Sequence, residues 1–138
     1  MFRMPIDITD LDARRLRAVL SAYDGRSGPG RREVAQLRGE LERARVVPSR
    51  EISGRVVTMN SEVLLRDLDS QREFTCRLSY PDDSDADCGR ISVLAPVGTA
   101  ILGYREGTVV EWDVPAGRRR LRIEKILYQP EAAGDFDR

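Results

Sequence analysis

The chain has 138 residues, of which 33% are charged and 41% hydrophobic, and its 23 basic and 23 acidic side chains give no net charge. This composition is too apolar for a disordered chain, and no apolar run is long enough for a membrane span. The N-terminal residues lack the apolar segment of a secretion signal, so we expect a cytoplasmic protein. The chain contains no histidine, which excludes histidine-based nucleophile pairs and removes the commonest metal ligand.

The charged residues are unevenly distributed along the chain, and the two cysteines lie in different surroundings. Residues 1–50 have a net charge of +4, from eleven arginines and seven carboxylates, and residues 51–138 have a net charge of −4, from twelve basic and sixteen acidic side chains. Cys76 falls on the apolar side of an expected strand, whereas Cys88 lies in an acidic loop. We expect both to be free thiols, as is usual in a cytoplasmic chain.

The first 50 residues carry the pattern of two helices. Thr9 followed by Asp12 is typical of a helix N-cap with an acidic partner, and residues 24–30, with three glycines and a proline, end that helix. A second helix is expected over about residues 31–46. Apolar residues recur at helical spacing in both: Leu16, Val19, Leu20 and Tyr23, then Val34, Leu37, Leu41 and Ala44. The sequence predicts a short antiparallel hairpin, a coiled coil about 22 Å long, followed by a linker at residues 47–50.

After residue 50 the hydrophobic period changes to two, which indicates strands. They are expected near residues 56–60, 62–68, 73–80, 91–94, 108–114 and 118–128. Pro96 stands where a helix can begin and Gly103 suits its C-cap, so a short helix follows residues 91–94. Broken alternation at residues 126–128 predicts either a β-bulge or burial on both faces of the strand. The sequence therefore predicts an α+β protein, with a helical hairpin in residues 1–50 and a strand-rich domain in residues 51–138.

No set of residues has the spacing of a catalytic, cofactor or metal site. The acidic loop at residues 83–89 begins like a calcium loop, but Cys88 and Leu94 stand where an EF-hand needs glycine and glutamate. At the hairpin tip only Asp24 is acidic, with Arg26 close by, whereas a catalytic Mg²⁺ needs clustered carboxylates. We therefore expect a binding protein rather than an enzyme.

Two further segments allow more than one interpretation. Basic side chains line the last strand: Arg118, Arg119, Arg120 and Arg122. They could contact nucleic acid, but no aromatic residues interleave with them, and pairing on the sheet face with Glu111, Asp113 or Glu124 is favoured. The apolar junction at residues 93–97 could be core, an exposed docking patch, or both.

Several short segments resemble the Rnk and GreA/GreB family of bacterial RNA-polymerase-binding factors. They read V-T-M-N-S from Val57, L-D from Leu68, L-S-Y-P from Leu78, I-S-V-L-A-P-V-G from Ile91, A-I-L-G from Ala100, V-P-A-G from Val114 and L-Y-Q-P-E-A-A-G-D from Leu127. The T-M-N-S and Y-Q-P-E-A-A-G-D segments are similar to Rnk rather than to a Gre factor.

The resemblance implies an FKBP-like, Gre-type fold for residues 51–138 and binding to bacterial RNA polymerase at the rim of its secondary channel. In Gre factors a polar or acidic residue and a proline at the strand-to-helix junction take part in docking. Pro96 matches that proline, and Leu94 replaces the polar residue. The resemblance thus implies a more apolar docking surface at Leu94, Ala95, Pro96 and Val97.

Gre factors stimulate transcript cleavage with acidic residues at the tip of a longer coiled coil. The short hairpin here, with Asp24 and Arg26 at its tip, implies binding without cleavage and competition with Gre-type factors. Nucleic acid would be met only indirectly, within the transcription complex.

Three other functions stay open. The resemblance to Rnk implies regulation of nucleoside diphosphate kinase, either directly or through its expression. An FKBP-like fold suggests a prolyl isomerase, although the eight scattered aromatic residues assemble no obvious pocket. The narrow apolar stripe of the hairpin could also pair between chains in an oligomeric scaffold.

Overall fold

The computed structural model describes residues 6–23, 31–114 and 117–136, so Asp24 and Arg26 lie outside the described residues. In chain order the elements are β1 (Asp7–Thr9), α1 (Asp10–Ser21), α2 (Arg31–Arg43), β2 (Arg45–Val47), β3 (Glu62–Asp67), β4 (Glu73–Ser79), η1 (Pro81–Asp83), η2 (Ala86–Cys88), β5 (Arg90–Ser92), α3 (Pro96–Ile101), β6 (Val109–Val114) and β7 (Gly117–Tyr128). The expected α+β class is confirmed. No helix in the described part of the chain is long and apolar enough to cross a membrane.

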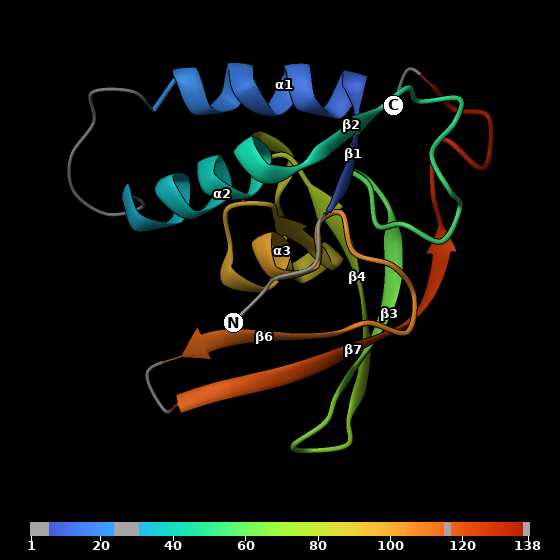
Figure 1. Cartoon of the computed structure of the whole chain (residues 1–138). Coiled ribbons are helices and arrows are strands. Elements are labelled where there is room, and N and C mark those ends of the chain that lie inside the picture. Colours follow the sequence, from blue (N-terminus) through green and yellow to red (C-terminus); the bar gives the residue numbers. More distant parts are fainter. Residues whose placement is uncertain (1–5, 24–30, 115–116, 137–138) are drawn as a thin grey trace.

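A five-stranded sheet, in the order β5-β4-β3-β7-β6, forms the body of the molecule (Figure 1). Its strands are antiparallel except for the parallel pair β4 and β5. The predicted bulge is confirmed, because Glu62 and Val63 pair with Tyr128 and Ile126 and so skip Leu127. A second irregularity skips Glu124 on the same strand.

Helices α1 and α2 lie side by side and run in opposite directions (Figure 1). The Thr9 hydroxyl accepts the Asp12 N–H at 3.0 Å, which confirms the predicted N-cap. Most of the predicted stripe is buried: Leu16, Leu20, Val34, Leu37 and Leu41. The helices have 12 and 13 residues, so each extends about 18–20 Å, slightly less than expected.

The predicted end of the second helix was wrong, and a small parallel sheet takes its place. α2 ends at Arg43, and β2 pairs with β1 across 38 residues of sequence. Asp7 and Arg45 face each other in that register, and their side chains form two hydrogen bonds of 3.0 and 2.9 Å. The Asp7 N–H also donates to the Gly103 carbonyl at 3.2 Å. The pair therefore ties the base of the helices to the end of α3.

The strand expected at residues 56–60 is absent from the described structure, which has there an isolated bridge between Val56 and Arg105. Val57 is held by hydrogen bonds of 2.9 Å to the Tyr104 carbonyl and from the Gly103 N–H. The chain then turns at Asn60, whose φ is +67°. Because this backbone bonds to loops rather than to a strand, its two valines are buried without forming a ladder.

The expected strand at residues 91–94 ends at Ser92. The Ser92 hydroxyl and carbonyl accept the N–H groups of Leu94 and Ala95, each at 3.0 Å, and this tight turn leads into α3. Gly98 in α3 packs so closely that a Cβ there would lie 2.3 Å from the Ser92 carbonyl oxygen. At Gly103, with φ +83°, a Cβ would lie 2.6 Å from that of Ile6.

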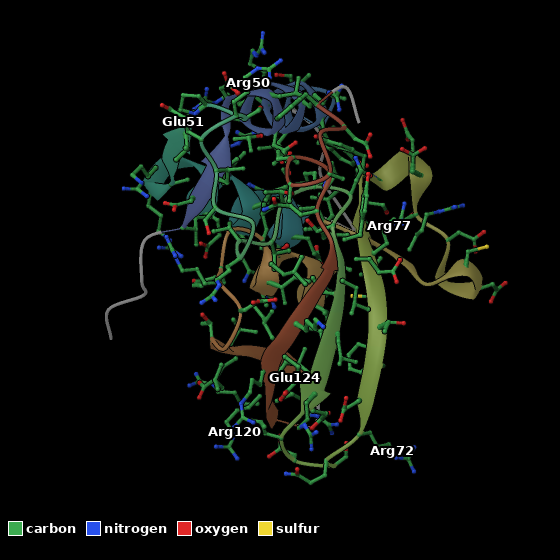
Figure 2. The ribbon with its side chains drawn as sticks, turned by 90° about the vertical axis from the view of Figure 1, so that its right-hand side faces the viewer. Arg50, Glu51, Arg72, Arg77, Arg120 and Glu124 are labelled. Atoms are coloured by element: carbon green, nitrogen blue, oxygen red, sulfur yellow. The ribbon has the colours of Figure 1, made fainter. Side chains whose placement is uncertain are left out.

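One hydrophobic core runs from the helices into the sheet. Fully buried members from both parts include Ile6, Ile8, Leu16, Leu37, Met59, Leu65, Leu78, Ile101, Leu121 and Ile123. The sheet face toward the helices is thus apolar, whereas the opposite face carries charged side chains (Figure 2). The helical pair therefore shares the core of the sheet domain, with α2 in contact with α3, rather than projecting from the domain unsupported.

Candidate functional site: an apolar junction and a buried polar cluster

The predicted docking residues lie together at the start of α3. Pro96 is exposed, and Leu94, Ala95 and Val97 are half-buried, with Leu94 and Val97 packed against the core. Val93, just before them, is fully buried. The junction is therefore both core and surface, and Pro96 is its most accessible residue.

The junction rests on a rigid support. The Thr99 hydroxyl, itself buried, donates to the Val93 carbonyl at 2.6 Å, and the Val93 N–H donates to the Ser79 carbonyl at 2.9 Å. Pro96 occupies the first position of α3, where its missing N–H costs nothing. Since Leu94 to Val97 carry no ionisable side chain, this surface can offer shape and apolar contact to a partner, but not acid–base chemistry.

A buried polar cluster, formed by Asp12, Thr58, Ser61 and Gln129 together with the half-buried Glu131, joins α1 to the sheet domain, and the sequence reasoning missed it. The Asp12 side chain is 1% exposed. Its carboxylate accepts the Met59 N–H at 3.1 Å and lies 3.4 Å from the Tyr80 hydroxyl. The sequence contained a signal for the burial of Asp12, because Asp12 stands four residues before Leu16 and so lies on the apolar face of α1.

Burial has a strong effect on this carboxyl group. It raises the pKa of Asp12 to about 7, with a further increase from the negative charge of Glu131, while the hydrogen bond from the Met59 N–H opposes the shift. Burial also raises the pKa of Tyr80. Asp12 therefore titrates near neutral pH inside the contact between α1 and the sheet domain.

The two segments that resemble Rnk meet in this cluster. Thr58 and Ser61 bond to each other at 2.9 Å, and the Thr58 hydroxyl donates to Glu131 at 2.7 Å. The Gln129 side chain donates to the carbonyls of Ser53 and Val56 at 2.7 and 2.8 Å and accepts the Ala132 N–H at 3.1 Å. These motif residues thus hold the turns around residues 53–61 and 129–135 together.

The arginines of β7 pair with carboxylates, as predicted. Arg118 contacts Glu111 at 3.2 Å and Arg122 contacts Glu124 at 3.3 Å. The other two partners were not foreseen: Arg119 pairs with Asp67, and Arg120 lies 3.5 Å from Asp69. The side chain of Asp113 is outside the described part of the structure. Paired in this way, the ladder is not a free basic surface.

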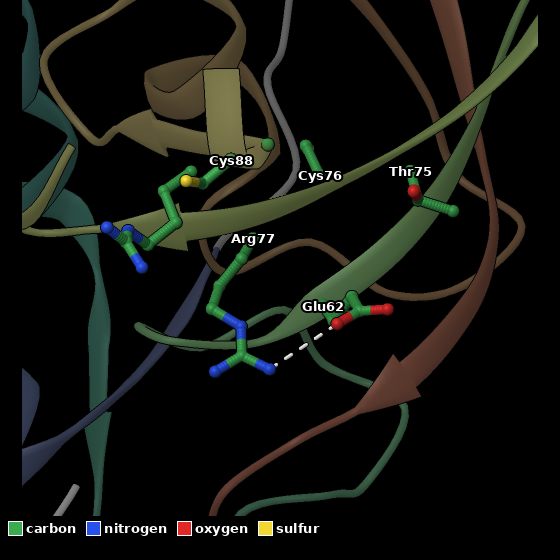
Figure 3. Close-up of a pocket in the computed structure, with 7 residues that line it drawn as sticks. Glu62, Thr75, Cys76, Arg77 and Cys88 are labelled. Atoms are coloured by element: carbon green, nitrogen blue, oxygen red, sulfur yellow. Dashed lines mark hydrogen bonds and ion pairs between the residues drawn. The ribbon is translucent and has the colours of Figure 1, made fainter. Parts of the chain in front are cut away.

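Both cysteines line a polar hollow of about 310 Å³ beside β4, in which Arg77 contacts Glu62 at 3.4 Å (Figure 3). They are free thiols, as expected. Burial raises the pKa of Cys76 to about 11, and hydrogen bonding to Asp85 raises the pKa of Cys88. Neither thiol is therefore activated as a nucleophile at neutral pH.

The acidic loop is folded around a turn at Asp85. Asp85 accepts the Asp87 N–H at 3.1 Å and lies 3.8 Å from Arg90. Within the described ranges, no three cysteine or acidic side chains converge as metal ligands.

Comparison with known proteins matches both parts of the chain. The family model "Transcription elongation factor, GreA/GreB, C-term" matches residues 48–128, and the model "Rnk N-terminus" matches residues 5–47. A curated relative from Escherichia coli strain K12, named "Regulator of nucleoside diphosphate kinase", is 39% identical over 99% of this chain and 98% of its own length. The transcription elongation factor GreA of Desulfotalea psychrophila is 33% identical over 80% of this chain and 66% of its own.

A solved structure agrees with these matches. A prokaryotic transcription elongation factor GreA/GreB from Nitrosomonas europaea superposes with a TM-score of 0.72 at 43% identity, covering 91% of this chain and all of that one. The molecule is thus a helical pair packed on a Gre-type α+β domain. The chain belongs to the Rnk and GreA/GreB family, in which its N-terminal helices match the Rnk model.

Proposed function

We propose that this protein is a transcription regulator that binds bacterial RNA polymerase at the rim of the secondary channel through Leu94, Ala95, Pro96 and Val97. The observation that carries the proposal is the exposure of Pro96 on a rigid strand-to-helix turn of a Gre-type domain. The contact is apolar, and the proposal places the protein in the cytoplasm, where it meets the polymerase.

The proposal assigns different tasks to the two parts. Residues 51–138, in an FKBP-like arrangement, dock on the polymerase, and residues 1–50, as a short coiled coil, occupy the channel entrance. Helices of 12 and 13 residues reach only about 20 Å, which supports blocking of the channel rather than stimulation of transcript cleavage. The protein then acts by competing with Gre-type factors, without being an enzyme itself.

The first test is binding to purified core RNA polymerase. Leu94→Asp and Pro96→Asn, each checked for folding, should reduce binding at least about tenfold, because a charge or a lost ring disrupts a small apolar contact. Leu127→Asp is the matched control, because Leu127 is an exposed leucine (45%) on β7, away from the junction. Absence of binding by the wild type, or equal losses in all three variants, would reject the docking surface.

A second test addresses the outcome of binding. In a stalled transcription complex the protein alone should give no increase in transcript cleavage, and added to a Gre factor it should lower the stimulated cleavage in proportion to its concentration. Cleavage stimulated by the protein alone would contradict the proposal.

Regulation of nucleoside diphosphate kinase is a second candidate function. It is favoured by the relatives of that name, which align with nearly the whole chain. Co-purification of the kinase with this protein would support direct regulation. Changed kinase abundance without a complex would instead support an effect through expression. If the kinase neither co-purified nor changed in abundance, this candidate function would be rejected.

A further inference from the structure

A second hollow, unrelated to the junction, lies where α1, the turn after β2 and the C-terminal segment meet. Its volume is about 390 Å³, within the range of small-molecule sites. Its charged lining comes from Arg14 and Arg15 on α1 and from Arg50, and among the residues that the structure describes Asp10 is its one acidic lining residue. Figure 2 shows Arg50 beside the helices, at the opposite end of the molecule from Arg72 and Arg120.

The carboxylate of Asp10 already accepts hydrogen bonds from neighbouring groups of the protein. One oxygen of Asp10 accepts the Leu11 N–H at 2.8 Å, the Ser49 N–H at 3.2 Å and the Ser49 hydroxyl at 3.0 Å. These bonds, with the Ser49 hydroxyl foremost, lower the pKa of Asp10, so it stays ionised as part of the turn. Three guanidinium groups and one carboxylate give the described lining residues a net charge of +2.

The arginines here differ from those of β7. Within the described residues, neither Arg14 nor Arg50 forms a salt bridge, although the charge of Arg14 contributes to the lowered pKa of Asp10. Arg15, in contrast, interacts with Tyr80 and with Asp12. The guanidinium groups that line this hollow are well suited to an anion, because their planar donor groups match phosphate oxygens.

The hollow also has an apolar wall. Leu11, Pro48 and Phe136 line it, and the Arg50 guanidinium lies 4.4 Å from the centre of the Phe136 ring. Such a stacked pair offers a flat surface on which an aromatic ring can pack. A bare phosphate ion would use the cations but leave most of the volume and this wall unfilled.

We propose that this hollow binds a free nucleotide, with its phosphates on Arg14, Arg15 and Arg50 and its base against Phe136. A ligand in this position contacts both the helices and the turn that follows them. It would therefore brace the helical pair on the sheet domain and stabilise the folded protein. The inference does not depend on polymerase binding.

The test is titration of the full-length protein with ADP, followed by NMR of the backbone amides and by thermal unfolding. Saturable shifts at Ser49, Arg50 and Phe136 are expected, with a rise in Tm. The variant Arg14→Gln/Arg50→Gln should weaken ADP binding at least about tenfold. Arg72→Gln/Arg120→Gln, which removes the same charge from the opposite end of the molecule, should leave it unchanged.

Further probes separate the parts of the ligand. Pyrophosphate should bind more weakly than ADP, and Phe136→Ala should reduce ADP binding to that level, while adenosine without phosphate should give no saturable shifts. No saturable response to millimolar ADP would overturn the proposal, and so would equal weakening by both arginine pairs. Much tighter binding of a single-stranded oligonucleotide that ADP does not displace would also overturn it, by assigning the hollow to nucleic acid.

Discussion

The buried polar cluster and the apolar junction both contain segments that resemble the family, yet they use their residues in opposite ways. Asp12 and Gln129 in the cluster are at most 3% exposed, and their side chains form hydrogen bonds with the backbone of neighbouring turns. Pro96 at the junction is exposed and makes no polar contact through its side chain. A family motif can therefore lie either in internal hydrogen bonding or on exposed surface, and the fold distinguishes the two.

The largest difference between the buried polar cluster and the apolar junction should be seen in how substitutions in them change the pH dependence of stability. The pKa of Asp12 is raised from 3.8 to about 7 on folding, so the folded state binds the extra proton between these values. The free energy of unfolding should fall as pH rises from about 4 to 7, by roughly 4 kcal/mol from this group. Asp12→Asn should remove that slope in urea unfolding followed across this range.

The matched control for this prediction is Asp83→Asn, because Asp83 is exposed in η1 and is not one of the cluster residues. It should keep the slope of the wild type. If Asp12→Asn kept that slope as well, the buried carboxyl would not be the titrating group.

The next largest effect is expected from a substitution that disturbs the close packing under the junction. Gly98→Ala places a Cβ 2.3 Å from the Ser92 carbonyl oxygen and 3.0 Å from the Val93 Cα, so it should lower the free energy of unfolding by about 3 kcal/mol. Gly39→Ala in α2 is the control, since nothing lies within 4 Å of its added methyl group. That change should raise stability by up to about 1 kcal/mol in the same chemical denaturation experiment. A neutral Gly98→Ala would contradict the packing described here.

A smaller loss is expected from Gln129→Leu. It leaves two buried carbonyls, those of Ser53 and Val56, without their donors, at a cost of about 2 kcal/mol in unfolding free energy. Gln36→Leu on the exposed face of α2 should change stability by less than about 0.5 kcal/mol. Equal effects of the two substitutions would mean that Gln129 does not hold the turn at residues 53–56.

The smallest effect on stability belongs to the junction. Pro96→Asn should change the free energy of unfolding by less than about 1 kcal/mol, because the ring is exposed at the first position of α3. The comparison is sharpened if the same variant loses polymerase binding while Gln129→Leu, measured where it is fully folded, retains it. A large loss of stability from Pro96→Asn would instead mean that the junction is core.

Local patterns predicted much of this fold, because they depend on neighbours in sequence. The Thr9 cap, the apolar stripes of the helices, the alternation along β7 and the break at Leu127 all follow from short-range spacing. Likewise, a proline followed seven residues later by glycine was enough to delimit α3.

What could not be predicted depends on contacts across the chain. The β1–β2 pair joins residues 38 positions apart and has no period to detect. The burial of Asp12 needs the Met59 N–H, which is 47 residues away, and the hollow around Arg50 needs Phe136. The candidate docking residues could be named from resemblance, but their division into half-buried and exposed positions required the turn at Ser92.

The anchoring of α1 at its first turn has a geometric consequence. Thr9, Asp12 and the β1–β2 pair fix the base of the helices on the sheet domain, so the distance from Pro96 to the far ends of α1 and α2 is set by helix length alone. Under the proposed function, Pro96 is the fixed contact with the polymerase, and the length of the helices sets how far they reach from it. Adding seven residues to each helix would extend that reach by about 10 Å while keeping nearly the same helical face inward, so the reach would change while the residues proposed to dock stay the same.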